Sequence, residues 1–424
     1  MAYLQKVYLH KLIQKLNVLL QTVFLMSGNI YLNIKEFFKS GNQKKFRKFK
    51  IFLLLLFFVF LSGRLLQLVD KYSVNIFFWD QWDFYTPLFE NRSLWEIFSY
   101  LHFPHRQGIA MVVDKYVFEL SNWDTRIETF FIVFVVILTS ILALYLKYKL
   151  YKKISFSDIF IPLLFLNAGA YESYLQVPNP SHSAFPLLIV LLYCLTLTFK
   201  NIHAKYIFLL LANFLGIYTG FSIFLGLLTP VLILFGIVEN RKNGKTFFFL
   251  ILIFFISIIS FLSFFINYKF GSASSCFVFP HTKPFEYVEY ISLQYIGIIR
   301  PTGAINSGVY LGFIFAAFTV ISAFLFSIRI FSDAYKSIPA KKNLLVIISL
   351  LLFSLLFSLN NAIGRVCFSV DYGQNSRYYI YLVPGFLGIY FAIFEISKKM
   401  KKFGLFFSVV VVILFGYSNF KFKS

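Results

Sequence analysis

Two carboxylates flanked by aromatic side chains form the densest group of chemically reactive residues in the sequence. Asp80 and Asp83 lie within the stretch Phe77–Tyr85, which also contains two tryptophans. Residues three apart share a face if the segment is helical, and the aromatic side chains favour the membrane–water interface. A carboxylate held there can accept a proton from a hydroxyl group, so we interpret Asp80 and Asp83 as candidate catalytic bases. The alternative is an interfacial aromatic belt with solvated acids.

A second group of polar residues is spread along the chain at the edges of apolar segments. Histidine can relay protons, and arginine offers a planar fork that binds a phosphate or a carboxylate. We interpret this group as candidate substrate-binding residues. A polar turn at Pro104 and anchoring of the arginines at lipid headgroups are the alternatives. The group comprises His105, Arg106, Glu172, Gln176, Arg300, Arg365, Arg377 and Tyr378.

The composition requires a membrane environment for these residues. Of the 424 residues, 59% are hydrophobic and only 14% are charged, whereas an ordinary soluble domain has about 25% charged residues. A spanning helix needs about 20 apolar residues. We therefore expect an all-α fold, a polytopic transmembrane helical bundle of about 11 spans. The expected spans lie near 51–69, 129–149, 157–174, 182–199, 204–220, 222–238, 246–267, 308–330, 343–360, 378–396 and 402–418.

Basic residues predict the orientation. The net charge is +22, but Lys and Arg lie in short runs between apolar segments, which is typical of orientation signals and not of nucleic-acid binding. The run before residue 51 predicts a cytoplasmic N-terminus, with 1–50 as a basic amphipathic region on the inner surface and 51–424 as the membrane domain. Segment 70–128 is then a large external loop. It holds nine of the 18 acidic residues: Asp70, Asp80, Asp83, Glu90, Glu96, Asp114, Glu119, Asp124 and Glu128.

Cysteine spacing and motif content limit the cofactors. The three cysteines show no CxxC or Cys/His zinc spacing. Cys276 and Cys367 both fall in expected external segments, so a disulfide between them is open. No Walker loop, dinucleotide-binding glycine pattern, HExxH or GxSxG occurs, so any reaction must draw its energy from an activated substrate. Paired acids can also hold a divalent cation, which the sequence leaves open.

In this combination the chain resembles the GT-C superfamily of membrane glycosyltransferases. More narrowly, it is similar to bacterial polytopic proteins of surface-polysaccharide loci, and the similarity covers most of 51–396. Each motif is short, so the order of the motifs and the topology carry the resemblance. The motifs are Trp79–Asp83, His105-Arg106, Glu172…Gln176 and Gly364-Arg365…Gln374-Asn375-Ser376-Arg377-Tyr378.

The resemblance implies an inverting glycosyltransferase of the bacterial cytoplasmic (inner) membrane. Its donor would be an undecaprenyl-phosphate sugar, that is, a polyprenyl-phosphate donor, and its acceptor a cell-surface glycan such as lipopolysaccharide O-antigen. Asp80 or Asp83 would be the base, and Arg300, Arg365 or Arg377 would stabilise the leaving phosphate. An O-antigen polymerase and a non-enzymatic flippase or transporter of lipid-linked sugars remain as alternatives.

These roles make a spatial prediction. The acids at Asp80 and Asp83 and the arginine segment Gly364–Tyr378 are far apart in the sequence. We expect them to form opposite walls of one cleft at the outer membrane surface.

Overall fold

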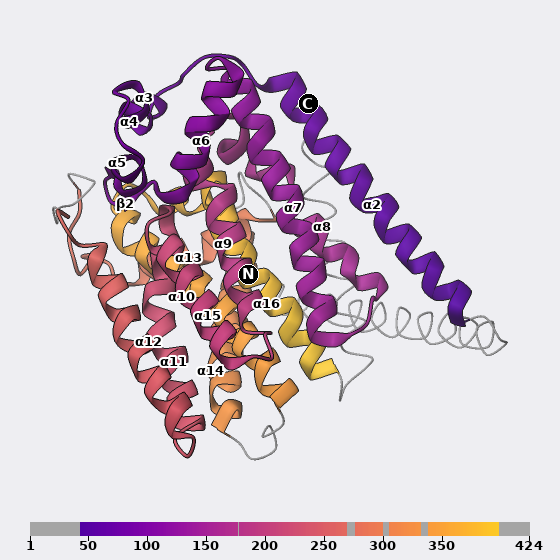
Figure 1. Cartoon of the computed structure of the whole chain (residues 1–424). Coiled ribbons are helices and arrows are strands. Elements are labelled where there is room, and N and C mark those ends of the chain that lie inside the picture. The colour runs from indigo at the N-terminus through magenta and orange to yellow at the C-terminus, as the bar shows by residue number, and fades with distance from the viewer. Residues whose placement is uncertain (1–42, 177, 269–275, 300–304, 332–337, 398–424) are drawn as a thin grey trace, which may run out of the picture. The chain divides into compact units, whose positions relative to one another are not determined.

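The computed structural model describes residues 43–176, 178–268, 276–299, 305–331 and 338–397 (Figure 1). The chain divides into two compact units, residues 1–55 and 56–424. Helix α2 (Gln43–Tyr72) begins in the first unit and ends in the second. The only strands in the described ranges are the two-residue β1 (Leu101–His102) and β2 (His105–Arg106), which pair antiparallel. The predicted all-α class is confirmed.

Seven helices in the described ranges are long and apolar enough to cross a membrane. Each coincides with one of the predicted spans, so the chain is a helical membrane protein. The helices are α2, α7 (Thr125–Tyr151), η5 (Gly220–Ile223) continued by α11 (Phe224–Glu239), α12 (Gly244–Ser263), α14 (Ile305–Phe331), α15 (Ile338–Arg365) and α16 (Tyr379–Ser397).

Three more predicted spans are shorter apolar helices: α8 (Phe160–Phe165) with its flanking turns, α9 (Ala184–Thr196) and α10 (Ile202–Ile217). α10 and α11 are two separate helices packed side by side, because Thr229 Oγ1 donates a hydrogen bond to Asn213 Oδ1 at 2.9 Å. The predicted span 402–418 lies outside the described residues. The number of about eleven spans therefore stays a prediction.

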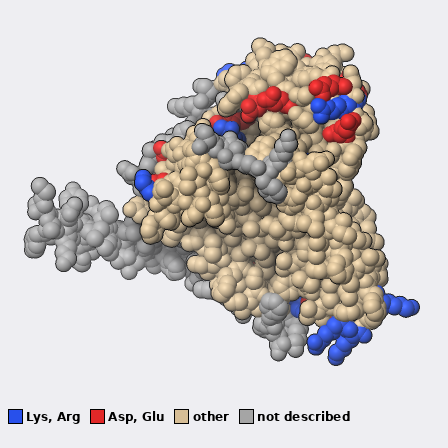
Figure 2. Space-filling view, turned by 90° about the vertical axis from the view of Figure 1, so that its left-hand side faces the viewer, with Lys and Arg blue, Asp and Glu red and all other residues tan. Residues whose placement is uncertain are grey.

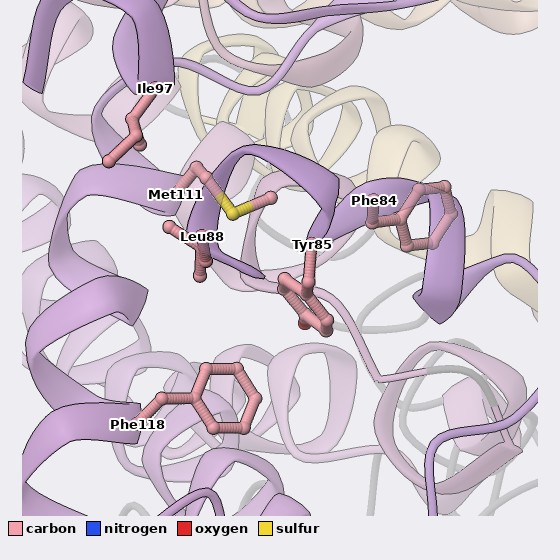
Figure 3. Packing of buried hydrophobic residues seen from close by; sticks show 6 residues of the cluster. All are labelled: Phe84, Tyr85, Leu88, Ile97, Met111 and Phe118. Carbon is pink, nitrogen blue, oxygen red and sulfur yellow. The ribbon is translucent and has the colours of Figure 1, made fainter. Parts of the chain in front are cut away.

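The segment between α2 and α7 folds into a compact layer, which we call the acidic layer. Short helices α3 (Gln81–Phe84), α4 (Thr86–Phe89) and α5 (Leu94–Ser99) lead through the β1–β2 hairpin into α6 (Gly108–Ser121). α5 begins with a capping box between Ser93 and Glu96. Figure 3 shows side chains of α3 and α4 gathered with side chains of α6. This small core consists of Phe84, Tyr85, Leu88, Ile97, Met111 and Phe118.

The acidic layer carries several large, exposed aromatic side chains. All four tryptophans of the chain lie in it, and each is exposed. Tryptophan concentrates at the level of lipid headgroups, where its ring can be half apolar and half wet. The tryptophans are Trp79, Trp82, Trp95 and Trp123.

The segment after α15 is held against α13 (Phe285–Gly297). Cys276 and Cys367 form a disulfide, so the pairing that the sequence left open is present. The turn η7 (Val370–Gln374) follows, and a Cβ on its Gly373 would come within 2.6 Å of the Tyr290 carbonyl oxygen. A side chain at that position would force the two backbones apart. The turn η8 (Ser376–Tyr378) comes next and leads directly into α16.

The basic runs gather at one end of the helices. Lys341 at the start of α15 pairs with Glu239 at the end of α11 at 2.6 Å. Lys342 lies among the basic residues of the α7 end and Lys200. On the face shown in Figure 2, acidic side chains gather at the upper end with some basic side chains among them, and basic side chains gather at the lower end. This polarity matches the pattern from which the orientation was predicted.

A buried ion pair links helices at the basic end. Lys147 Nζ contacts Asp158 Oδ2 at 2.7 Å, and both side chains are almost fully buried. The Tyr390 hydroxyl donates to Asp158 Oδ1 at 2.6 Å. These contacts connect α7, the turn η1 (Phe156–Ile159) and α16. Asp158, an acid near a predicted span boundary, is therefore held as a structural link between helices.

Candidate active site

A pocket of about 110 Å³ opens between the acidic layer and the turns at the same end of the helices. Four segments that are far apart in the sequence supply its walls. The lining combines two acids, a histidine, an arginine and a ring of aromatic side chains. The lining residues are Trp79, Asp80, Phe84, Glu172, Ser173, His182, Phe221, Arg377, Tyr378 and Tyr381.

Asp80 lies directly before α3, and the buried side of this helix is firmly anchored. Gln81 Nε2 donates to the Pro178 carbonyl oxygen at 3.0 Å and to Glu128 Oε2 at 3.5 Å. The Tyr85 hydroxyl donates to Glu128 Oε1. Two anchors four residues apart fix the rotation of the short helix. They leave the preceding Asp80 in the pocket wall.

A buried carboxyl pair underlies this anchor. Asp114 on α6 and Glu128 at the start of α7 are both completely buried, with the Tyr85 hydroxyl close to both. Burial raises the pKa of Asp114 well above its ordinary value. Removal from water penalises the charged form, so Asp114 is a neutral acid in this environment. From the sequence both residues are only two of the nine acids of the loop, and this positioning role depends on the tertiary structure.

Glu172 connects the third predicted span to the arginine segment. Its carboxylate accepts a hydrogen bond from the backbone N–H of Arg377 at 2.9 Å, and its own N–H donates to Ser376 Oγ at 3.2 Å. The Ser173 hydroxyl donates to the Arg377 carbonyl oxygen at 3.4 Å. The carboxylate therefore holds the backbone of η8 and fixes the point from which the Arg377 side chain extends.

The guanidinium groups of Arg365 and Arg377 form no ion pair with an Asp or Glu of the described ranges. Nε of Arg377 is buried and lacks a hydrogen-bond partner in this part of the chain. Both charges lie close enough to influence the hydroxyl of Tyr290 on α13. Each guanidinium packs over a neighbouring ring, Arg365 over Phe368 and Arg377 over Tyr378. Two such groups at one end of the bundle suit a bound anion such as a phosphate.

Two glycines let three loops meet behind the pocket. Gly108 and Gly220 have φ angles of +62° and +54°, and a Cβ on either would overlap with a backbone carbonyl of another loop. Only glycine adopts this conformation without cost and permits such contact. Ser181 Oγ also donates to the Gln107 carbonyl oxygen at 2.7 Å. These contacts place β2, the turn η4 (Pro180–His182) and η5 side by side.

His105 and His182 meet at this junction. Their Nε2 atoms form a hydrogen bond, with ring centroids 4.1 Å apart. Burial and, to a smaller extent, the nearby charges of His102 and Arg377 lower the pKa of His182 to about 3. The pKa of His105 is also well below its ordinary value, again mainly through burial. Both imidazoles are therefore uncharged at neutral pH.

Arg106 does not line the pocket. Its side chain is buried and donates hydrogen bonds to the carbonyl oxygens of Phe264, Ile266 and Ser99. The Phe264 and Ile266 carbonyls lie just beyond the C-terminus of α12, where backbone acceptors lack helical partners. The guanidinium also packs over the Tyr218 ring at 5.4 Å. In the structure Arg106 links the acidic layer to α12, and its predicted role in substrate binding stays a prediction.

The predicted site residues differ in their position relative to the pocket. Asp83 is exposed and does not line the pocket, so the structure separates it from Asp80. Arg300 and the side chain of Gln176 lie outside the described residues. The pocket includes Asp80, Glu172, Arg377 and Tyr378, while His105 and Arg365 lie beside it without lining it.

Sequence reasoning missed several pocket residues. His182 falls at the start of the predicted span 182–199 and was not among the candidate site residues. Phe221 and Tyr381 belong to segments that are rich in aromatic residues, and the sequence does not show which of these residues has a functional role. A signal existed only for His182, because a histidine at the end of an apolar segment is costly to bury without a partner.

A divalent cation was also left open by the sequence. No cluster of three or more His, Cys, Asp or Glu side chains that could hold a metal ion occurs in the described part of the chain. Asp80 and Glu172 are the two acids of the pocket lining. A cation there would need further oxygen ligands from a substrate, as is usual for Mg²⁺ beside phosphate groups. The cation stays a prediction.

Comparison with known proteins identifies no relative. No family model matches the chain, and neither a curated protein nor a solved structure matches it.

Proposed function

We propose that this chain is a membrane glycosyltransferase of the GT-C type. It transfers a sugar from an undecaprenyl-phosphate donor to a hydroxyl of a cell-surface glycan. The observation that carries the proposal is that one pocket is lined by both Asp80 and Arg377, with Arg365 close by. A carboxylate that can act as a base and a guanidinium that can bind a phosphate are the two groups that transfer from a phosphate-linked sugar needs, and neither Asp80 nor Arg377 forms an ion pair with another described residue.

In the proposed reaction Asp80 acts as the base, and Arg377 and Arg365 act on the leaving phosphate. Asp80 takes the proton from the acceptor hydroxyl as its oxygen attacks the anomeric carbon of the donor sugar. The bond between this carbon and the phosphate oxygen breaks, and the configuration inverts. The lipid phosphate leaves with the bonding electron pair. Arg377 and Arg365 stabilise its charge, and the pocket aromatics provide faces for the sugar ring.

Three features support a reaction on the outer side of the bacterial cytoplasmic membrane. The Cys276–Cys367 disulfide lies in the segments that flank the candidate site, and disulfides persist in oxidising compartments. The basic runs gather at the opposite end, as the positive-inside rule requires of a cytoplasmic face. The four exposed tryptophans suit the headgroup level of the outer leaflet, where a lipid-linked donor lies. The N-terminus is then cytoplasmic.

The test is transfer by the purified full-length protein in liposomes. The donor is an undecaprenyl-phosphate sugar carrying a radiolabel, and the acceptor is a lipid-linked surface glycan. Label should move to the glycan without a change in its polymer length on a gel. Elongation of the glycan would favour the polymerase alternative. Movement of the labelled donor between leaflets without transfer would favour the flippase alternative.

A further inference from the structure

His182 lies in the wall of the pocket, and its partner His105 lies beside the pocket without lining it. We infer that His182 binds substrate as an uncharged hydrogen-bond donor, presenting its Nδ1–H to an oxygen of the donor's phosphoester. We infer also that His105 is the positioning residue that fixes this tautomer. The identity of the ligand rests on the proposed function, whereas the tautomer follows from the contacts of the two rings.

The assignment of the tautomer starts from His105. A hydrogen bond between two Nε2 atoms needs a proton on only one of them. Nδ1 of His105 is buried and has no hydrogen-bond partner among the described residues. If that atom carried the proton, a buried N–H would be left without an acceptor, which is the arrangement that proteins avoid most strictly. The proton of His105 is therefore on Nε2 and is donated to His182 Nε2.

The tautomer of His182 follows directly. Its Nε2 accepts, so in the neutral ring its proton is on Nδ1. His182 lines the pocket, and its Nδ1 has no hydrogen-bond partner in the described part of the chain. The ring therefore has a free N–H donor in the pocket wall.

The ring is held rigidly in this position. The Tyr381 hydroxyl donates to the His182 carbonyl oxygen at 2.9 Å. The Phe84 ring packs against the imidazole at 4.8 Å in an edge arrangement. Asn179 begins the turn η4 by accepting from the Ser181 N–H at 2.7 Å. A donor fixed before the substrate arrives costs no reorganisation during the reaction, which is the basis of electrostatic preorganisation.

The charged groups around the ring explain why a neutral donor suits the pocket. His102 and His105 face it from the hairpin and Arg377 faces it from η8, while Arg365 at the end of α15 acts on His105. A proton on His182 would add a positive charge beside that of Arg377. The acids of the pocket are Asp80 and Glu172. A neutral His182 does not form an ion pair with Asp80, which leaves that carboxylate available as the base.

Two amide substitutions at His182 form a matched test. The amide nitrogen of Asn corresponds in reach to Nδ1, and the amide nitrogen of Gln corresponds to Nε2. The probe is undecaprenyl phosphate without a sugar, and its Kd is measured with the full-length protein in nanodiscs. We expect His182→Asn to stay within about threefold of the wild type and His182→Gln to bind about tenfold or more weakly. Equal binding by both variants would overturn the inference.

His105 provides the test of positioning. His105→Gln retains a donor near the Nε2 position, and His105→Leu removes it. We expect the Leu variant to weaken binding of the lipid phosphate about tenfold and the Gln variant to restore most of the loss. The ratio of the His182→Gln to wild-type Kd should stay constant from about pH 5.5 to 8, because titration of the ligand cancels in it. A ratio that grows as the pH falls would mean that His182 binds as a cation, against the inference.

A spectroscopic measurement covers the case in which a variant does not fold. Solid-state NMR of the wild-type protein with 15N-labelled histidine distinguishes Nδ1–H, Nε2–H and doubly protonated rings. The pair should give one Nδ1–H ring and one Nε2–H ring, and two rings of the same tautomer would overturn the assignment. If the wild type binds no lipid phosphate while the NMR result is as expected, the proposed function fails and the tautomer assignment stands.

Discussion

The backbone N–H of Arg377 donates a hydrogen bond of 2.9 Å to the carboxylate of Glu172, across a sequence separation of 205 residues. Because the contact involves the backbone, it fixes the start of the Arg377 side chain and leaves the guanidinium free. Glu172 therefore acts on any bound anion through Arg377.

Removal of this contact should weaken use of the donor. We expect Glu172→Ala to raise the KM for the undecaprenyl-phosphate sugar about tenfold, because a hydrogen bond to a charged group is lost. Glu172→Gln retains an acceptor oxygen and should lie between Ala and the wild type. Steady-state transfer kinetics in liposomes would show the difference. A loss confined to kcat, with KM unchanged, would contradict a positioning role.

Substitution of the two candidate bases, Asp80 and Asp83, should have clearly different effects on activity. Asp80 lines the pocket, whereas Asp83 is exposed and lies outside it. We expect Asp80→Asn to lower kcat by about 10²- to 10⁴-fold, the usual contribution of a general base. Asp83→Asn, the matched control three residues further along the chain, should keep activity within a few-fold. Full activity of the Asp80 variant would remove the carboxylate from the mechanism.

Arg377 should show the preference for guanidinium over ammonium that phosphate recognition requires. Its guanidinium has no acidic partner in the described ranges, so its removal leaves no carboxylate unpaired. We expect Arg377→Ala to weaken binding of undecaprenyl phosphate by about tenfold or more, and Arg377→Lys to recover only part of it. Equilibrium binding in nanodiscs at two salt concentrations provides the measurement. Unchanged affinity in the Ala variant would place the phosphate elsewhere.

The disulfide should stabilise the fold around the site. It closes a loop with a sequence separation of 91 residues between Cys276 and Cys367. A disulfide of this kind contributes about 2–4 kcal/mol, chiefly by restricting the unfolded chain. Cys276→Ser and Cys367→Ser should each lower the melting temperature of the detergent-solubilised protein. The double variant should be no less stable than either single variant, and an additive effect would show that the sulfurs do not pair.

Asp114 should give the protein an unusual dependence of stability on pH. Burial raises its pKa in the folded state above the unfolded value of about 3.9. The folded state therefore holds its proton more tightly than the unfolded state, and this difference stabilises the fold. The stabilisation is fully present below the unfolded pKa. It is lost as the pH rises from the unfolded to the folded pKa, by about 1.4 kcal/mol of unfolding free energy per pH unit.

Asp114→Asn tests this sign. The variant keeps the size and has no charge to bury, so its melting temperature should exceed that of the wild type at pH 8 and approach it at pH 4. Thermal unfolding of both proteins across this range would show the crossover. A wild type that gains stability relative to the variant as the pH rises would refute a neutral Asp114.

Particular residues show how far sequence reasoning reached into the site. Asp80, Glu172, Arg377 and Tyr378 were predicted from their chemistry, and all four line one pocket. Arg106 was predicted from the same chemistry, yet its donors are used by the carbonyls beyond α12. An arginine that binds substrate and one that caps a helix look alike in a sequence. The difference depends on which backbone lies within reach.

The sequence by itself determined the helical membrane class, the gathering of basic runs at one end and the presence of acids in the layer between α2 and α7. These follow from hydropathy and charge along the chain, which act locally and need no knowledge of packing. Only the tertiary structure decided that Asp80 and not Asp83 faces the pocket, and that His182 joins it. Those choices depend on the anchoring of Gln81 and Tyr85 by Glu128 and on close approach of loops at Gly108 and Gly220. Side-chain direction in short, irregular elements is set by such distant contacts, and local residue patterns do not encode it.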